Sequence, residues 1–313
     1  MTTKHIGWWS AGVTSAVACK FLVEQYGAEN VRLIYFKIDS AHEDNARFMR
    51  ECEQWYGTKI EVTGSKKYKD QFDVIEDTRY INGPAGARCT TELKKGVRLR
   101  IQQETEYLSQ TFGFEYQPKE INRALRFQDQ YPEALAEFPL IERGMDKPAC
   151  LHFLESNGIE RPVMYKLGYP NNNCKGCVKG GMGYWNKIRV DFPDVFQQMI
   201  DAEEDIGRSC INGVFLKDLE PDRGRDLEII MPDCGSFCEI KHTEIPHVLV
   251  NDIVNIPFLI RNPNPWVNGI GFESFQIPRK AVELFGEPLD SSRKRIVYPG
   301  KVTLTDKPEQ VIV

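Results

Sequence analysis

Apolar and polar positions along the N-terminal part of the chain predict strands that alternate with helices. His5–Trp9, Val31–Ile38 and Lys59–Val62 are short runs rich in residues that favour β-strands. Between them, Ala16–Tyr26 and Asn45–Tyr56 place apolar side chains at helical spacing. Such alternation is typical of a parallel sheet whose strands are joined by crossover helices. We therefore expect an α/β fold.

The pattern farther along predicts more helices, one more strand and a loop. The expected helices are Thr91–Gln103, Asn122–Phe127, Pro132–Leu135, Lys147–Asn157 and Val195–Ile206. A strand is expected within Glu106–Phe114, and no regular element over Asp73–Gly86, where Gly83-Pro84 is a breaker. Gly168–Tyr184 is rich in glycine and asparagine and predicts an ordered loop built around two cysteines.

The composition is that of an ordinary globular protein. The chain has 313 residues, 41% of them hydrophobic and 27% charged, enough for one large α/β domain with an appendage or for two ordinary domains. Its formal net charge of -5 argues against a globally basic nucleic-acid binder. No apolar run approaches the roughly 18 residues of a membrane span, and Met1–Trp9 is too polar for a signal peptide. We expect a cytoplasmic protein without membrane contact, whose 9 cysteines stay reduced.

The first expected strand runs into a loop of small residues, Ser10–Ser15, that is followed by a helix. Backbone N–H groups in such a loop can approach phosphate oxygens, and the helix N-terminus adds partial positive charge. The hydroxyls of Ser10, Thr14 and Ser15 are further donors. The alternative is a tight turn capped by a serine or threonine. The segment is not a Walker A loop, because the lysine of that motif is missing.

This loop resembles the PP-loop, S-G-G-x-D-S, of ATP pyrophosphatases and PAPS reductases. Ser10, Gly12 and Ser15 match it, whereas Ala11 replaces the first glycine and Thr14 replaces the aspartate. The resemblance implies a Rossmann-like fold of the adenine nucleotide alpha hydrolase type that binds ATP or PAPS with Mg²⁺. It places the nucleotide against Ser10, Ala11, Gly12, Val13, Thr14 and Ser15, and the adenosine beneath Ile38 and Asp39.

A second segment, Gly83–Lys94, resembles the C-T-x-x-L-K element of PAPS reductase-like proteins, notably the sulfurtransferase subunit of DNA phosphorothioation. Arg88 and Lys94, with the nearby Lys95 and Arg98, concentrate positive charge that suits a nucleotide. A cysteine beside cations at a helix start should have a lowered pKa, which makes Cys89 a candidate catalytic residue. The alternative is an amphipathic helix with a buried cysteine and a solvated basic face.

The most specific local feature is the C-x-x-C pair Cys174 and Cys177, whose two thiolates can reach one metal. The pair Cys234 and Cys238 can supply further ligands, and Cys89 competes for the fourth position. Both a [4Fe-4S] cluster and Zn²⁺ use such sets. The alternatives are a redox disulfide or simple buried cysteines.

The run Tyr165–Arg189 resembles uncharacterised bacterial and phage proteins of the PAPS reductase-like kind, and the resemblance covers residues 5–239. It implies nucleotide-dependent sulfur transfer or thiolation with release of pyrophosphate, in which the cysteine centre handles sulfur. One alternative is a PAPS or APS reductase, with Cys234 of Asp233-Cys234-Gly235 as the nucleophile. Another is a non-catalytic nucleotide-binding protein with structural zinc, which Thr14 in place of the aspartate favours.

Three parts of the chain are expected from this interpretation. Residues 1–160 form the nucleotide-binding α/β domain, residues 161–239 a cysteine-rich helical and loop region of that domain, and residues 240–313 a C-terminal appendage of unknown role. The sulfur acceptor, a nucleic acid or a small molecule, is left open, and so is a homodimer.

Overall fold

A parallel sheet of five strands lies at the centre of this computed structural model, which describes residues 4–83, 86–224, 274–277 and 309–312. The strands are β1 (Lys4–Trp9), β2 (Val31–Phe36), β3 (Ile60–Thr63), β6 (Tyr107–Thr111) and β7 (Ala136–Glu137). Their order is β3-β2-β1-β6-β7, and every neighbouring pair is parallel. The predicted α/β fold is confirmed, with β7 as an additional short strand at one edge.

Crossover helices make the sheet parallel, as the alternating pattern predicted. α1 (Val13–Tyr26) connects β1 to β2, and α2 (Asn45–Tyr56) connects β2 to β3. α2 ends at Gly57, which has a φ of 69° and donates its N–H to the carbonyl of Glu53. After β3 the chain returns to the other side of β1 to form β6, so the strand order reverses beside β1. In open α/β sheets, ligands bind outside the carboxyl ends of the strands at such a reversal.

Side chains alternate between two cores, one on each face of the sheet. Trp8 and Ile34 point into one core, together with apolar residues of α5 (Gly96–Glu104) and α6 (Pro118–Gln130). Trp9 and Leu33 point into the other, which contains residues of α1, α2 and α8 (Lys147–Ser156). Because both faces are covered, the strands are apolar on both sides, which is why the sequence shows continuous apolar runs there.

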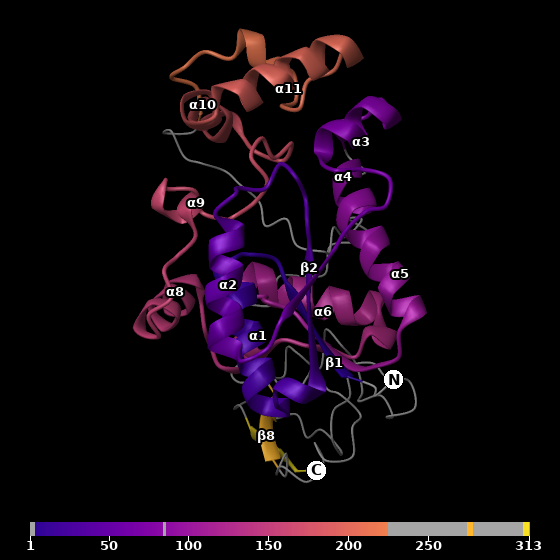
Figure 1. Cartoon of the computed structure of the whole chain (residues 1–313), viewed down its shortest axis with the longest axis vertical. Helices are drawn as coiled ribbons and strands as arrows, with labels where there is room; N and C mark the ends of the chain where they lie inside the picture. The colour runs from indigo at the N-terminus through magenta and orange to yellow at the C-terminus, as the bar shows by residue number, and fades with distance from the viewer. Residues whose placement is uncertain (1–3, 84–85, 225–273, 278–308, 313) are drawn as a thin grey trace.

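A third core lies beyond the carboxyl ends of the strands. Figure 1 shows α10 (Met182–Asp191) and α11 (Pro193–Ile206) there, on the same side as α3 (Gln71–Thr78). Tyr184, Trp185 and Met199 are fully buried in this core, and Ile75 of α3 joins them. This cluster positions the segment that carries Cys174 and Cys177.

Two of the longer helices, α3 and α10, were not predicted. α3 forms where no regular element was expected: the Asp70 side chain caps it by accepting hydrogen bonds from the N–H groups of Phe72 and Asp73, but the helix has only 8 residues. α10 begins at Met182, inside the segment expected to be a loop. The four consecutive residues Gly183, Tyr184, Trp185 and Asn186 are all buried, so burial extends round most of α10 and leaves no one-sided apolar stripe by which a surface helix is predicted.

The remaining elements are short, apart from the run that leads into α5. That run begins as α4 (Arg88–Thr90) and passes through a π-helical segment, Thr91–Lys95. The others are α7 (Pro139–Glu142), α9 (Val163–Lys166), the antiparallel pairs β4 (Asn82–Gly83) with β5 (Gly86–Ala87) and β8 (Ser274–Ile277) with β9 (Glu309–Ile312), and 3-10 turns at Ala28–Asn30, Pro132–Ala134 and Leu216–Asp218. Among the described helices, none is long and apolar enough to cross a membrane. The expected boundary near residue 240 lies outside the described residues.

Candidate nucleotide-binding site

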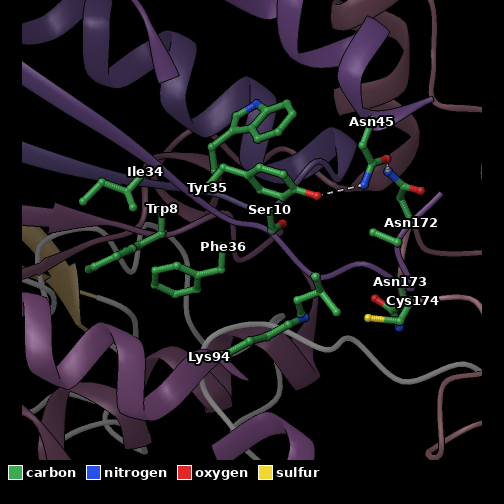
Figure 2. A pocket seen from close by; sticks show the side chains of 13 residues that line it. Trp8, Ser10, Ile34, Tyr35, Phe36, Asn45, Lys94, Asn172, Asn173 and Cys174 are labelled. Atoms are coloured by element: carbon green, nitrogen blue, oxygen red, sulfur yellow. Dashed lines mark hydrogen bonds between the residues drawn. The ribbon is translucent and has the colours of Figure 1, made fainter. Parts of the chain in front are cut away.

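A pocket opens at the carboxyl ends of β1 and β2, beside the point where the strand order reverses. It holds about 470 Å³ of empty space, part of it open to solvent. Its walls include the apolar side chains of Trp8, Ile34, Phe36 and Ile38. Its polar lining comes from Ser10, Asn45, Lys94, Asn172, Asn173 and Cys174. Figure 2 shows the last three of these together on one side of the pocket, with Trp8 and Ile34 on the other.

The loop after β1 is built around the hydroxyl of Ser15. This hydroxyl accepts hydrogen bonds from the N–H and the hydroxyl of Ser10, both at 3.0 Å, and donates to the Gly12 carbonyl at 2.9 Å. Ala11 has a φ of 61°, a left-handed conformation that costs about 1–2 kcal/mol for a residue with a Cβ. A glycine would adopt this conformation without that cost.

Helix α1 begins at Val13 without a side-chain cap, since its N-cap residue is Gly12. The Ser15 hydroxyl closes the turn before the helix, so the alternative of a turn capped by a serine or threonine stays open beside phosphate binding. The Val13 N–H donates to the hydroxyl of Tyr165 at 3.2 Å. Within the described part of the chain, the N–H groups of Gly12, Thr14 and Ser15 make no hydrogen bond. These donors and the partial positive charge of the helix N-terminus suit an anion.

The segment that follows β6 packs directly against this loop. A Cβ added to Gly113 would lie 2.6 Å from the Cα and the N of Ser15 and 2.8 Å from the carbonyl carbon of Thr14. Only a glycine lets the two backbones approach so closely. The Phe112-Gly113-Phe114 segment therefore supports the loop from the neighbouring strand.

The cysteine segment is held against the loop that precedes α2 and against the start of α3. The Lys175 N–H donates to the Ser40 carbonyl at 2.9 Å, and the Lys175 carbonyl accepts from the Gln71 side chain at 2.9 Å. The Tyr184 hydroxyl closes the turn: it accepts from the Cys177 N–H at 2.8 Å and donates to the Cys174 carbonyl at 3.2 Å. As a result, Cys174 faces the pocket, whereas Cys177 is buried in the third core.

The fold brings Cys89 into the same region. Cys89 and Cys174 both pack against a small apolar cluster that contains Val74 and Leu93, and Cys89 also packs against the third core, which contains Cys177. The described residues nevertheless include no group of three His, Cys, Asp or Glu side chains placed to hold a metal ion. The cysteines of this part of the chain therefore do not by themselves fit a zinc or iron–sulfur site.

The other candidate ligands, Cys234 and Cys238, lie outside the described residues. The predicted metal centre and the assignment of Cys234 as a nucleophile therefore stay predictions.

The predicted cationic residues separate in space. Lys94 lines the pocket from the π-helical segment. Arg88 is not part of the lining and pairs with Glu92 at 2.8 Å. Arg98, expected to add exposed positive charge, is fully buried; its guanidinium lies over the Phe127 ring at 5.4 Å, and burial lowers its pKa to about 10. Its role is in the core, so that expectation was wrong.

Of the two residues expected beneath the adenosine, only one lines the pocket. Ile38 lines the pocket, whereas Asp39 lies outside the lining and forms an ion pair with Lys37 at 3.2 Å. The Asp39 carboxylate is about half exposed, with 48% of its side-chain surface accessible to solvent. Its predicted role in nucleotide binding is not tested by this arrangement.

Sequence reasoning missed a chain of polar residues behind the pocket. The Asn172 amide donates to the Ala11 carbonyl at 2.7 Å and to Asn45 Oδ1 at 2.7 Å, and Asn45 Nδ2 donates to the Tyr35 hydroxyl at 3.2 Å (Figure 2). Burial is the main cause that raises the pKa of Tyr35, so the hydroxyl stays protonated. The signal in the sequence was the run Asn171–Asn173 before Cys174, interpreted only as loop composition.

Two solved structures are similar to this chain at a distance. One is the phosphate complex of phosphoadenylyl-sulfate (PAPS) reductase from Candida auris, with a TM-score of 0.39 and 11% identity over 56% of this chain and 82% of that chain. The other is the U34-tRNA thiolase NcsA from Methanococcus maripaludis with its [4Fe-4S] cluster, with a TM-score of 0.36 and 14% identity over 65% of this chain and 66% of that chain. No protein family model and no curated protein matches the sequence.

Proposed function

We propose that the chain binds an adenine nucleotide in this pocket and uses it for sulfur transfer with release of pyrophosphate. The observation that carries the proposal is the meeting of three elements at one edge of the sheet. Ser10, the first residue of the Ser10–Ser15 loop, lines a single pocket together with Lys94 and Cys174. The first two suit phosphates, and the third is a sulfur nucleophile at the same place.

In the proposed reaction the pocket acts by stabilising negative charge on the leaving group. An oxygen of the acceptor attacks the α-phosphorus of ATP, the bond from that phosphorus to its bridging oxygen breaks, and pyrophosphate leaves. The N–H groups of Gly12, Thr14 and Ser15 and the positive charge of Lys94 offset the charge that builds on the leaving group. The transferred sulfur comes from a persulfide donor, which loads Cys174, the described cysteine that faces this space, as a persulfide. The outer sulfur of that persulfide displaces AMP and forms a disulfide between the acceptor and Cys174, and a thiol reductant then cleaves this disulfide to release the thiolated acceptor.

Mg²⁺ would enter with the nucleotide as part of the substrate. The loop offers no carboxylate to it, because Thr14 stands where the PP-loop pattern has an aspartate. This favours, as a second candidate, a protein that binds nucleotide without turnover. The two candidates share the pocket and differ only in whether pyrophosphate is released.

Binding is tested by calorimetry of the full-length protein with Mg-ATP, comparing Lys94→Met with Lys95→Met. Both changes remove one charge from the same helical run, but Lys95 is not part of the pocket lining and lies over the Tyr131 ring. We expect Lys94→Met to weaken ATP binding about tenfold, the effect of one charge-assisted hydrogen bond, and Lys95→Met to leave it unchanged. Absence of ATP binding by the wild-type protein would refute the proposal.

Turnover is tested by pyrophosphate release with candidate nucleic-acid and small-molecule acceptors, in the wild type and in Cys174→Ser. Loss of the thiolated product with nucleotide affinity retained is the expected result for Cys174→Ser. Sulfite release from PAPS instead of pyrophosphate release from ATP would point to sulfonucleotide reduction. Iron, zinc and acid-labile sulfide analysis of anaerobically purified protein decides whether the cysteines hold a cluster, zinc or neither.

A further inference from the structure

The peptide group between Ala11 and Gly12 has a carbonyl with partial negative charge and an N–H with partial positive charge. The side chain of Asn172, far along the sequence, determines the orientation of this peptide group. Asn172 Nδ2 lies 2.7 Å from the Ala11 carbonyl oxygen. A carbonyl can only accept, so the amide orientation of Asn172 is fixed by this contact. The carbonyl and the N–H of one peptide point in opposite directions. With the carbonyl held by Asn172, the Gly12 N–H points away from Asn172.

The opposite orientation would harm anion binding. A rotated peptide would direct a carbonyl, with its partial negative charge, to the side on which the Gly12 N–H now lies. Such a rotation changes ψ of Ala11 and φ of Gly12, and Gly12 resists it little because it has no Cβ. The Asn172 hydrogen bond therefore keeps the donor in place.

Asn172 is itself held firmly. Its amide also donates to Asn45 Oδ1 at 2.7 Å, and Asn45 in turn donates to the Tyr35 hydroxyl. Asn172 lies two positions before Cys174 in the segment that the Tyr184 hydroxyl and the Ser40 carbonyl fix. The nucleotide loop and the cysteine segment are thereby joined through one amide group.

We propose that Asn172 is a positioning residue for nucleotide binding. It orients the Ala11–Gly12 peptide so that the Gly12 N–H faces the bound phosphates. It also sets the position of Cys174 relative to the Ser10–Ser15 loop. This inference rests on the proposed nucleotide binding and adds a residue and a coupling to it. Pyrophosphate, which can occupy the loop without filling the pocket, should then alter the reactivity of the Cys174 thiol in the wild type but not when the amide of Asn172 is absent.

The test uses the full chain, inorganic pyrophosphate and the variants Asn172→Ala and Asn172→Asp. Asn157→Ala is the matched control, because Asn157 is exposed and its amide donates to the Phe153 carbonyl at the end of α8. Calorimetry should show pyrophosphate binding at least about tenfold weaker in both Asn172 variants, the loss expected when one charge-assisted hydrogen bond is not made. Asn157→Ala should bind like the wild type.

The second readout is the alkylation rate of Cys174, followed by peptide mass spectrometry with and without pyrophosphate. A change in rate in the wild type that disappears in the Asn172 variants supports the coupling. Equal pyrophosphate affinity in folded Asn172→Ala and wild type would overturn the inference, as would a pyrophosphate effect on Cys174 that persists without Asn172.

A measurement on the unsubstituted protein covers the case in which the variants do not fold. The Gly12 amide resonance should move downfield when pyrophosphate is added to ¹⁵N-labelled wild type, because its N–H becomes a donor to the anion. A Gly12 resonance that does not move while Thr14 and Ser15 resonances do would overturn the inference and leave nucleotide binding intact. No binding of pyrophosphate or ATP by the wild type would refute the proposed function itself.

Discussion

Replacement of Gly113 by alanine tests the loop without touching any group that binds a ligand. The added Cβ would lie 2.6 Å from the Cα and N of Ser15, whereas ordinary contacts begin at 3.4 Å. The segment that follows β6 and the loop must therefore separate by about 0.8 Å. Because the crowded atoms are backbone, no side-chain rotation relieves the contact, and we expect a loss of about 1–3 kcal/mol in the free energy of unfolding.

The same displacement predicts a specific loss of affinity. An N–H group that moves by about 0.8 Å takes a hydrogen bond of about 2.9 Å beyond the range in which it contributes. Losing one charge-assisted bond of this kind costs about 1.5–3 kcal/mol, which is about a 10- to 150-fold weaker affinity for ATP or pyrophosphate. Calorimetry at a fixed ionic strength measures this, and urea unfolding measures the stability.

Gly57→Ala is the control matched for stability. Gly57 has a φ of 69° and no atom within 4 Å of an added Cβ, so alanine there costs about 1 kcal/mol through backbone strain alone, at the end of α2. We expect this variant to be destabilised and to bind nucleotide like the wild type. If Gly113→Ala is folded and binds ATP as tightly as Gly57→Ala, the loop does not hold the phosphates, and the reasoning fails.

Three further predictions concern stability. Burial lowers the pKa of His5 from 6.5 to about 4, so the unfolded chain binds a proton more readily than the folded one. The free energy of unfolding should therefore fall as the pH drops from about 6.5 to 4, by up to about 3 kcal/mol at about 1.4 kcal/mol per pH unit. Urea unfolding across this range should show a weaker pH dependence for His5→Gln, and the same pH dependence as the wild type would contradict the role of His5. Glu203 is fully buried and accepts the backbone N–H groups of Cys210 and Leu216 at 2.7 and 2.6 Å. Glu203→Gln should therefore cost about 2 kcal/mol in urea unfolding, while the exposed Glu204→Gln should stay within about 0.5 kcal/mol; equal effects would refute a stabilising role of these two hydrogen bonds. Tyr184→Phe removes the acceptor of the Cys177 N–H, so the free energy of unfolding should fall by about 1–3 kcal/mol. Alkylation of Cys177, measured by mass spectrometry, should become faster, and an unchanged alkylation rate would show that the turn holds without the hydroxyl.

Much of the fold was predictable because it depends on local patterns. Asn45–Tyr56 has one apolar face, and α2 begins and ends at those residues. The three N-terminal strands were recognisable as apolar runs bounded by helices. The short loop Ser10–Ser15 between a strand and a helix marked the candidate site, because a run of small residues in that context is itself the signal.

The predictions that failed have a common physical cause. α10 is buried on several sides, and α3 is only 8 residues long, so neither gives a clear periodic pattern. Arg98 is typical of a solvated helix face in sequence, yet tertiary packing places it between aromatic rings. Burial decided these cases, and burial is a property of the whole fold.

The sequence by itself determined the alternation of strands and helices from β1 to β3, the small-residue loop and the cysteine spacing. Tertiary structure alone decided which distant residues meet there. It brought Asn172 to the Ala11 carbonyl, across 161 positions, and Gly113 against Ser15. It also separated Lys94, which lines the pocket, from Arg88, which pairs with Glu92. The physical reason is that a hydrogen bond or a backbone contact depends on separation in space, which a one-dimensional pattern of apolar and polar positions does not contain.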